Sequence, residues 1–219
     1  MNWNLSWISK KVNQIFDFFF PKTCIICSSE GLSVCTTCFS SMEKCEDFEI
    51  FDGIKAFSCF KYNEISGKII KDLKYNGRAE NAKEIAEMLY EANIPFEKFD
   101  FIIPVGTSFL KRVIRKYNAP NLIANHLNKR MKKRVLHSFF GKKFFGVKKS
   151  QVGLSRFERM ENLKNAFYVK SGENLEGKRI LLIDDVITTG ATVRTCVKEI
   201  SKFNPSEIII LSFARRDLS

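Results

Sequence analysis

The residues best suited to chemistry follow an apolar run that begins at Arg179. The carboxylates of Asp184 and Asp185 come near its end, and the segment from Thr188 to Thr192 then holds three threonines and a glycine. The apolar run predicts a buried parallel strand, and the pattern from Thr192 to Phe203 predicts a helix. A strand, a tight loop and a helix N-terminus together form an anion site, because the first N–H groups of a helix have no partner within it.

The loop and the acid pair together suit a sugar phosphate. Backbone N–H groups from Thr188 to Thr192 can surround a phosphate, with the helix dipole behind them. Two adjacent acids at the end of a buried strand repel each other, and a ribose diol, Mg²⁺ or both would satisfy them. The alternative is a plain strand–turn–helix with a surface acid pair. The segment from Gly172 to Lys178 has the spacing of a Walker A phosphate-binding motif. However, Arg179 stands where that motif requires Ser or Thr, and the predicted strand follows the segment instead of preceding it.

Four cysteines near the N-terminus form two closely spaced Cys-x-x-Cys pairs: Cys24, Cys27, Cys35 and Cys38. Two such pairs predict a structural zinc site, because four thiolates complete a tetrahedral zinc and leave no position for water. A redox pair needs only one such motif. The other three cysteines are interpreted as spare thiols, with Cys196 on the buried side of a helix.

The charge is concentrated in one window. The 219 residues carry 36 Lys and Arg against 24 Asp and Glu, a net charge of +12, yet residues 101–157 contain fourteen basic residues and no acid. Phenylalanines lie among these cations, an arrangement that suits single-stranded nucleic acid. The alternative is a solvated lysine-rich face. The first candidates for contact with DNA are Lys142, Lys143, Lys148 and Lys149.

The first twenty residues predict an amphipathic helix with an aromatic stripe that begins at Trp3 and Trp7. Packing against protein is favoured over membrane contact, with an interfacial membrane helix as the alternative. The sequence has no apolar run of transmembrane length and no signal-peptide pattern. We therefore expect a cytoplasmic protein, with the inner face of the membrane as the other location.

Strands alternate with helices through the rest of the chain, which predicts an α/β fold with a mostly parallel sheet. Expected strands cover residues 51–62, 99–105, 134–140, 166–169, 179–186 and 207–214. Expected helices cover residues 65–73, 79–90, 108–130 with a break at Pro120, and 192–203. The predicted domains are the helix at residues 1–20, the zinc finger at 21–47 and the α/β domain at 48–219. Ligands of such sheets bind beyond the carboxyl ends of the strands.

Taken together, these motifs resemble the ComF family (competence protein F, or ComFC), whose members have a domain like the type I phosphoribosyltransferases. The resemblance covers nearly the whole chain. Besides the acid-pair loop and the cysteines, it rests on Ile69–Gly77, Ile102–Val105, Arg112–Asn118 and Gln151–Arg156, continuing to Asn162 and Phe167. The chain departs from the family at Gly106, where a proline is usual, and at Lys116 and Ala119, where glycine and glutamine are usual.

The resemblance implies roles in binding phosphoribosyl pyrophosphate (PRPP). Thr188, Thr189, Gly190, Ala191 and Thr192 would hold the 5-phosphate, and Asp184 and Asp185 would hold the ribose hydroxyls and Mg²⁺. The pyrophosphate side would comprise Val105, Gly106, Thr107, Arg112 and Arg115. A mobile loop over the site would include Gln151, Arg156 and Arg159.

The family also implies a role in natural transformation. The expected function is binding of PRPP with Mg²⁺ and of single-stranded DNA, in the uptake or handling of transforming DNA with other DNA-uptake proteins. The alternative is an active phosphoribosyltransferase of base salvage or nucleotide metabolism. Whether the protein is an enzyme stays open, because no residue in the sequence is recognisable as a reader of an acceptor base.

Overall fold

The structure is a computed structural model that describes residues 23–46, 48–51, 53–75, 81–91, 94–106, 118–142, 167–170 and 172–216. The chain divides into two compact units between Met42 and Glu43. The smaller unit contains the short helix α2 (Thr36–Ser40) and an antiparallel bridge between Thr23 and Glu30. The predicted N-terminal helix lies outside the described residues.

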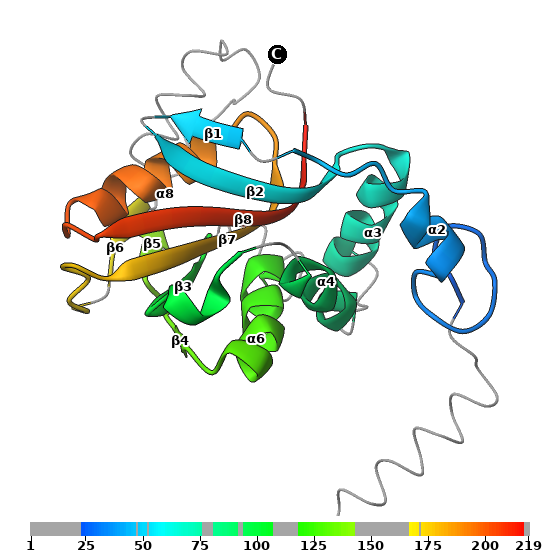
Figure 1. Cartoon of the computed structure of the whole chain (residues 1–219), viewed down its shortest axis with the longest axis horizontal. Coiled ribbons are helices and arrows are strands. Elements are labelled where there is room, and N and C mark those ends of the chain that lie inside the picture. The colour runs from blue at the N-terminus through cyan, green and yellow to red at the C-terminus, as the bar shows by residue number, and fades with distance from the viewer. Residues whose placement is uncertain are drawn as a thin grey trace, which may run out of the picture. The chain divides into compact units, whose positions relative to one another are not determined.

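A six-stranded sheet forms the centre of the larger unit, in the order β1-β2-β8-β7-β3-β4 (Figure 1). Its strands are β1 (Phe48–Phe51), β2 (Ile54–Lys61), β3 (Phe101–Pro104), β4 (Arg134–Val135), β7 (Arg179–Ile187) and β8 (Glu207–Arg215). Strand β1 pairs antiparallel with β2, and all other neighbours are parallel. The predicted α/β fold with a mostly parallel sheet, that of the type I phosphoribosyltransferases, is confirmed.

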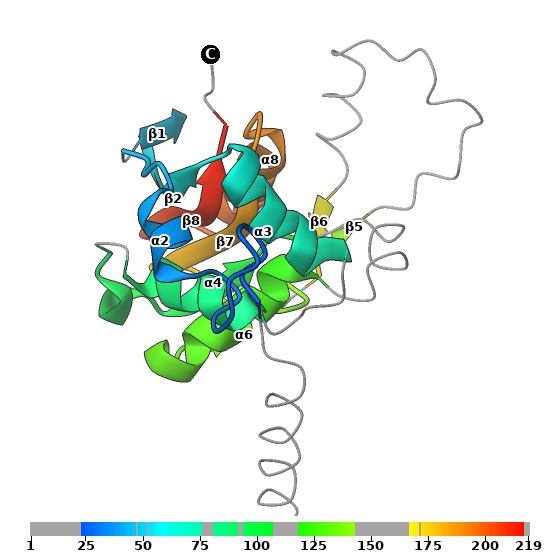
Figure 2. The same cartoon turned by 90° about the vertical axis from the view of Figure 1, so that its right-hand side faces the viewer.

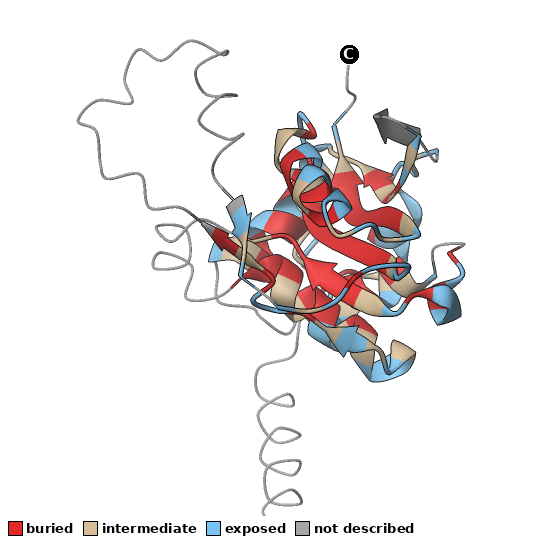
Figure 3. Ribbon diagram, turned by 90° about the vertical axis from the view of Figure 1, so that its left-hand side faces the viewer, coloured by how far each residue is buried: buried red, intermediate tan, exposed pale blue. Residues whose placement is uncertain are grey.

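The two central strands, β7 and β8, are buried along nearly their whole length, as Figure 3 shows by colour. Strands in a parallel sheet with both faces covered are apolar throughout, which explains the runs at Ile180–Ile183 and Ile208–Leu211. Their pairing is continuous from Arg179 and Glu207 to Ile187 and Arg215. Asp184 and Asp185 therefore lie near the carboxyl end of a strand that is paired along its length with β8.

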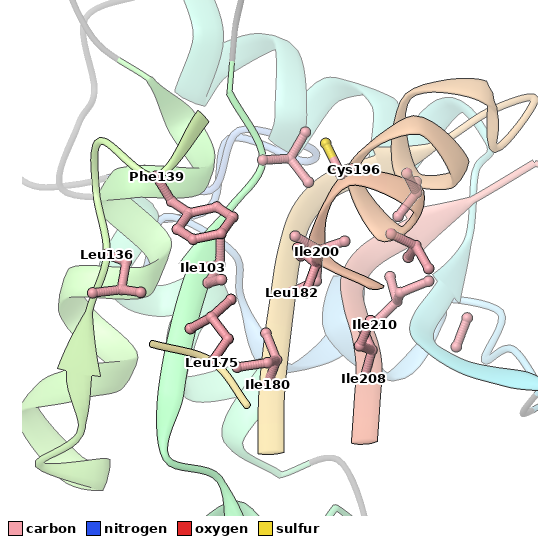
Figure 4. Close-up of a cluster of buried hydrophobic side chains, with 14 of the residues drawn as sticks. Ile103, Leu136, Phe139, Leu175, Ile180, Leu182, Cys196, Ile200, Ile208 and Ile210 are labelled. Atoms are coloured by element: carbon pink, nitrogen blue, oxygen red, sulfur yellow. The ribbon is translucent and has the colours of Figure 1, made fainter. Parts of the chain in front are cut away.

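Helices cover both faces of the sheet (Figures 1 and 2). On one face, Cys196 and Ile200 of α8 (Ala191–Ser201) pack against Leu182 of β7 (Figure 4). A two-stranded sheet of β5 (Phe140–Lys142) and β6 (Phe167–Val169) extends this cluster. The helices α4 (Asn81–Tyr90) and α6 (Ala119–Met131) contact the central sheet, and α3 (Glu64–Tyr75) packs on α4. The 3₁₀ helix η1 (Phe96–Lys98) precedes β3.

Two strands differ from the sequence-based expectation, and one helix start refines it. The expected strand at 51–62 is a hairpin, in which Gly53 has a φ of 75° in the turn between β1 and β2. Around Pro120 the expectation was a break, and the structure has α6 beginning at Ala119 after the extended Asn118, with Pro120 in its first turn, where its missing N–H costs nothing; residues 107–117 lie outside the described part. The expected strand at 134–140 is two short strands, because a turn between them brings Phe139 into the core.

Among the described helices, none combines the length and the hydrophobicity that crossing a bilayer requires.

Candidate functional site

The acid pair lies where the parallel strands end. Asp184 and Asp185 follow the apolar residues of β7, and as whole residues they are only 9% and 5% exposed. The backbone N–H of Asp185 donates to Oδ1 of Asp184 at 2.8 Å. Because successive side chains of a strand point to opposite faces, the two carboxylates diverge to the two sides of the sheet edge.

A lysine that the sequence analysis did not single out is the partner of one of these acids. Nζ of Lys74, near the end of α3, lies 2.8 Å from Oδ1 of Asp185. Both side chains are largely buried, with exposed fractions of 15% for Lys74 and 7% for Asp185. One sequence signal was available: Lys74 follows Ile70 by four residues, so it lies on the apolar stripe of its helix, where a lysine needs an anionic partner.

The loop after β7 has the backbone shape that the sequence predicted. Gly190 begins α8 in the left-handed region, with φ 70° and ψ −3°, and no side chain caps the helix. Thr188 and Thr189 are exposed, and Ala191 and Thr192 are half-buried. The hydroxyl of Thr189 accepts only a long contact from the N–H of Ala191, at 3.4 Å. The first turn of α8 thus presents backbone donors to the same edge as the acid pair.

The segment after β3 lies beside this loop. The N–H of Val105 donates to the carbonyl of Ile183 at 2.8 Å, so Val105 is directly next to the acid pair, followed by the half-buried Gly106. The buried Asn118 donates its Nδ2 to the carbonyl of Val105 at 3.3 Å and so holds this segment to the start of α6. The other predicted pyrophosphate and mobile-loop residues, Thr107, Arg112, Arg115, Gln151, Arg156 and Arg159, lie outside the described residues.

The donors at this edge suit Mg²⁺, which prefers carboxylate oxygens together with water and phosphate. Lys74 already pairs with one of the two acids, Asp185. The carboxylate oxygens at this edge are therefore donors of the type that a divalent ion takes.

The four predicted zinc ligands come together in the smaller unit. The Sγ atoms of Cys24, Cys27, Cys35 and Cys38 all lie within 4.8 Å of one another, and those of Cys27 and Cys35 are 3.6 Å apart. A tetrahedral zinc with Zn–S bonds of about 2.3 Å places its sulfurs about 3.8 Å apart. The cluster therefore has the dimensions of a four-thiolate metal site.

Backbone donors prepare this cluster for a metal. The N–H of Cys35 donates to Sγ of Cys24 at 3.4 Å, and the N–H of Cys38 donates to Sγ of Cys35 at 3.4 Å. Burial raises the pKa of Cys24, but backbone N–H groups, that of Cys35 foremost, outweigh it and lower the pKa to about 6. The Cys38 N–H likewise lowers the pKa of Cys35.

The Cys38 thiol behaves differently. Burial and the three neighbouring cysteines raise the pKa of Cys38 to about 12. Ionisation of all four sulfurs therefore calls for a cation between them, and a zinc ion would supply that charge.

In the described part of the basic window, acids from other segments of the chain pair with some of the basic side chains. Nη1 of Arg130 lies 2.6 Å from Glu87 of α4, and Arg134 forms a bidentate ion pair with Glu173. Nζ of Lys133 donates to the carbonyl of Glu97 at 2.8 Å. Acids from other segments thus pair with two of the arginines in this part of the window. Of the four lysines predicted to contact DNA, Lys142 belongs to β5 and Lys143, Lys148 and Lys149 lie outside the described residues.

Comparison with known proteins gives three findings. The profile of the phosphoribosyl transferase domain matches residues 79–217. Competence protein F of Haemophilus influenzae is 33% identical over 123 residues, 52% of this chain and 49% of that protein, so the match spans about half of that relative. Competence protein ComFC of Streptococcus pneumoniae is 25% identical over 194 residues, 84% of this chain and 82% of that protein.

Solved structures with a similar arrangement include two phosphoribosyltransferases. Orotate phosphoribosyltransferase from Aeropyrum pernix is 15% identical, with a TM-score of 0.40 over 81% of this chain and 77% of its own. Purine phosphoribosyltransferase from Pyrococcus horikoshii is 22% identical, with a TM-score of 0.40 over 64% of this chain and 74% of its own.

Proposed function

The chain belongs to the phosphoribosyl transferase domain family and is a ComF-type member of it, and from this premise we propose that it binds PRPP with Mg²⁺ and binds single-stranded DNA in the uptake or handling of transforming DNA. The observation that carries the first part is the end of β7. There, two buried acids lie immediately before a glycine turn and an uncapped helix N-terminus.

In this proposal the phosphate and the ribose bind to neighbouring parts of one loop. Thr188, Thr189, Gly190, Ala191 and Thr192 hold the 5-phosphate, because an uncapped first turn leaves N–H donors and the positive end of the helix dipole for an anion. Asp184 and Asp185 accept hydrogen bonds from the ribose hydroxyls and hold Mg²⁺. When bound, that ion would neutralise part of the negative charge of the pyrophosphate and help to orient it.

The pyrophosphate takes the side of the site next to β3. Val105 and Gly106 follow the carboxyl end of this strand, and the Val105–Ile183 hydrogen bond holds them against β7. Asn118 keeps the same segment in place from α6. We assign Thr107, Arg112 and Arg115 to the anion, and Gln151, Arg156 and Arg159 to a segment that closes over it, on the strength of the family pattern.

The proposal for DNA rests on charge and on the competence relatives. Because Arg130 and Arg134 are engaged by acids, the cations for a nucleic acid backbone come mainly from Lys142, Lys143, Lys148 and Lys149. Phe139 is buried in the core, so stacking with unpaired bases falls to Phe144 and Phe145 beside these lysines. The corresponding partners are single-stranded DNA and other DNA-uptake proteins, in the cytoplasm.

Calorimetry with PRPP in the presence of Mg²⁺ tests the sugar-phosphate part. We expect wild-type protein to bind and Asp184→Asn/Asp185→Asn to lose at least about tenfold in affinity, the loss typical of removing hydrogen bonds to charged groups. Asp100→Asn is a matched control, because Asp100 accepts from the N–H of Arg179 at the opposite end of the same strand. Equal PRPP affinity for the double variant and the wild type would contradict the proposal.

The same titration, repeated with a panel of bases and followed for pyrophosphate release, separates the two functions. Release of pyrophosphate with a base would make the protein an active phosphoribosyltransferase of salvage or nucleotide metabolism. Binding of PRPP without release supports a role for PRPP as a ligand of a DNA-handling protein.

DNA affinity measured against salt tests the second part. Each phosphate neutralised on a single strand contributes roughly 0.7 to the logarithmic salt slope. Replacing Lys142, Lys143, Lys148 and Lys149 by Glu should weaken binding and flatten that slope. A control variant with Glu at the exposed Lys55, Lys71, Lys83 and Lys198 should retain more of the DNA affinity and more of the salt slope. Two variants with equal slopes and affinities would show that only net charge attracts the DNA.

A further inference from the structure

We propose that Lys74 is an internal counter-ion that closes the acid pair to metal ions until an anionic ligand arrives. The identity of that ligand as a sugar diphosphate rests on the proposed function. The exclusion of metal ions by Lys74 concerns only the protein without ligand, and it follows from the position of one ammonium group.

The ion pair of Lys74 with Asp185 is unlike the others among the described residues. Both of its side chains are less than one-fifth exposed, whereas in the pairs Lys61–Glu43, Arg130–Glu87 and Arg179–Glu207 each side chain is more than one-third exposed. On the same helix, Lys68 and Glu64 form a pair with exposed fractions of 49% and 82%. Solvent screens the exposed pair, whereas the buried one keeps most of its attraction.

The fold holds Lys74 in this position from both ends of α3. At the N-terminus, Asn63 and Ser66 exchange hydrogen bonds, and the Ser66 hydroxyl also donates to the carbonyl of Lys61 at the end of β2. Near the C-terminus, the buried Asp72 accepts from Nδ2 of Asn81 in α4 at 2.6 Å. The lysine is therefore placed at the acid pair by its helix and is not a surface side chain that happens to reach it.

Packing beside the N-terminal anchor leaves the helix little freedom. A Cβ on Gly67 would lie 3.3 Å from the hydroxyl of Tyr62, tighter than most real Cβ contacts, so glycine permits the close approach. The N–H of Tyr62 donates to the carbonyl of Arg215 in β8, which ties this contact to the carboxyl edge of the sheet. The start of α3 is thus held at the carboxyl edge of the sheet, at the same edge as Asp185.

This placement puts the ammonium in competition with a metal ion. A Mg²⁺ ion binds a carboxylate oxygen at about 2.1 Å. An ion on Oδ1 of Asp185 would therefore lie within about 5 Å of the Lys74 ammonium, given the 2.8 Å ion pair. Two cations this close repel strongly in a largely buried site, so the free protein favours the lysine alone.

An anionic ligand changes that balance. Phosphate groups beside the acid pair offer Lys74 a second anion and screen the ammonium from the metal. Metal and anion then bind with positive cooperativity, because each removes part of the cost of the other. Lys74 acts through Asp185 as a positioning residue and sets the order in which the ligands bind.

The test is a titration of zinc-loaded, full-length protein with Mn²⁺ in place of Mg²⁺ and no PRPP, followed by electron paramagnetic resonance. The proteins are wild type, Lys74→Met, Lys74→Gln, Lys74→Arg and Lys74→Met/Asp185→Asn. Zinc content and circular dichroism of each variant establish that it folds.

We expect wild-type protein and Lys74→Arg to bind Mn²⁺ weakly, and Lys74→Met and Lys74→Gln to bind it at least about tenfold more tightly, because the competing charge is removed. The additional Asp185→Asn substitution should abolish the gain. Unchanged Mn²⁺ affinity in Lys74→Met and Lys74→Gln would overturn the proposal, as would a gain in Lys74→Arg equal to theirs. If neither neutral variant folds, wild-type protein that binds Mn²⁺ equally well with and without PRPP overturns it.

The outcome is distinguishable from failure of the proposed function. The first titration contains no PRPP, so tighter metal binding by the neutral variants supports the role of Lys74 even if PRPP does not bind. PRPP binding with unchanged Mn²⁺ affinity in those variants would instead support the proposed function and reject the counter-ion.

Discussion

In the cysteine module the groups around the Cys38 sulfur are three further cysteines, whereas at the carboxyl edge of the sheet the group beside Asp185 is a lysine. Both places gather anionic side chains in a partly buried setting. The four thiols can become thiolates together only with an external cation, so we expect the module to depend on a metal ion for its fold. The acid pair already has a cation of its own, so the sheet can fold before any ligand binds.

The comparison predicts the largest effect in the module. Replacing Cys35 by Ser should release the metal and unfold the segment around α2, because zinc binding supplies on the order of 10 kcal/mol to such modules. The sheet of the other unit should stay folded. Metal analysis together with circular dichroism checks both statements. Cys45→Ser is the control, since Cys45 lies outside the four-sulfur cluster, and a full equivalent of tightly held zinc in Cys35→Ser would refute the assignment.

At the sheet edge, loss of one partner of the ion pair should cost less but still be plain. Asp185→Ala leaves the largely buried Lys74 ammonium without its carboxylate, which should lower the free energy of unfolding by about 3 kcal/mol. Glu64→Ala breaks the exposed pair with Lys68 on the same helix and should cost at most about 0.5 kcal/mol. Urea unfolding of the two variants measures the difference, and similar losses would mean that burial does not distinguish the pairs.

The pH dependence of zinc binding sharpens the picture of the module. With a pKa of about 12, the Cys38 thiol must release its proton when it binds zinc, whereas Cys24, with a pKa of about 6, is already largely a thiolate at neutral pH. Zinc binding therefore releases at least one proton, and the apparent affinity should rise about tenfold or more per pH unit between about pH 6.5 and about pH 8. Competition with a zinc chelator at several pH values provides the test. A flat profile would show that the Cys38 thiol is not a ligand.

The smallest predicted effect concerns the anchor of α3. Asn63→Ala removes the reciprocal hydrogen bonds with Ser66 and should lower stability by about 1 kcal/mol. Asn174→Ala is the control, because its side chain accepts only a single bond within an exposed turn, from the N–H of Glu176. Thermal unfolding compares them. Equal, negligible losses would mean that α3 does not depend on this cap.

The same contrast explains what the sequence allowed us to predict. The cysteine ligands are close in sequence, and the acid pair, the glycine turn and the helix after it are continuous, so local patterns were enough. Lys74 is 111 residues away from Asp185. Its role depends on how α3 packs against the sheet, which no local pattern contains.

Long-range packing also explains the other differences. The basic window has no acid in its own sequence, but Glu87 and Glu173 from other segments pair with Arg130 and Arg134. The turn between β4 and β5 is a second case, because the burial of Phe139 in the core of the larger unit depends on residues far from it in the sequence.

The most direct test of the central claim is anomalous diffraction from crystals grown with Mn²⁺ and PRPP. We predict one zinc peak between the four sulfurs of Cys24, Cys27, Cys35 and Cys38. We also predict one manganese peak beside Asp184 and Asp185, with the 5-phosphate against the N–H groups of Thr188–Thr192. PRPP and manganese bound at any other place, with this edge of the sheet left vacant, would contradict the account.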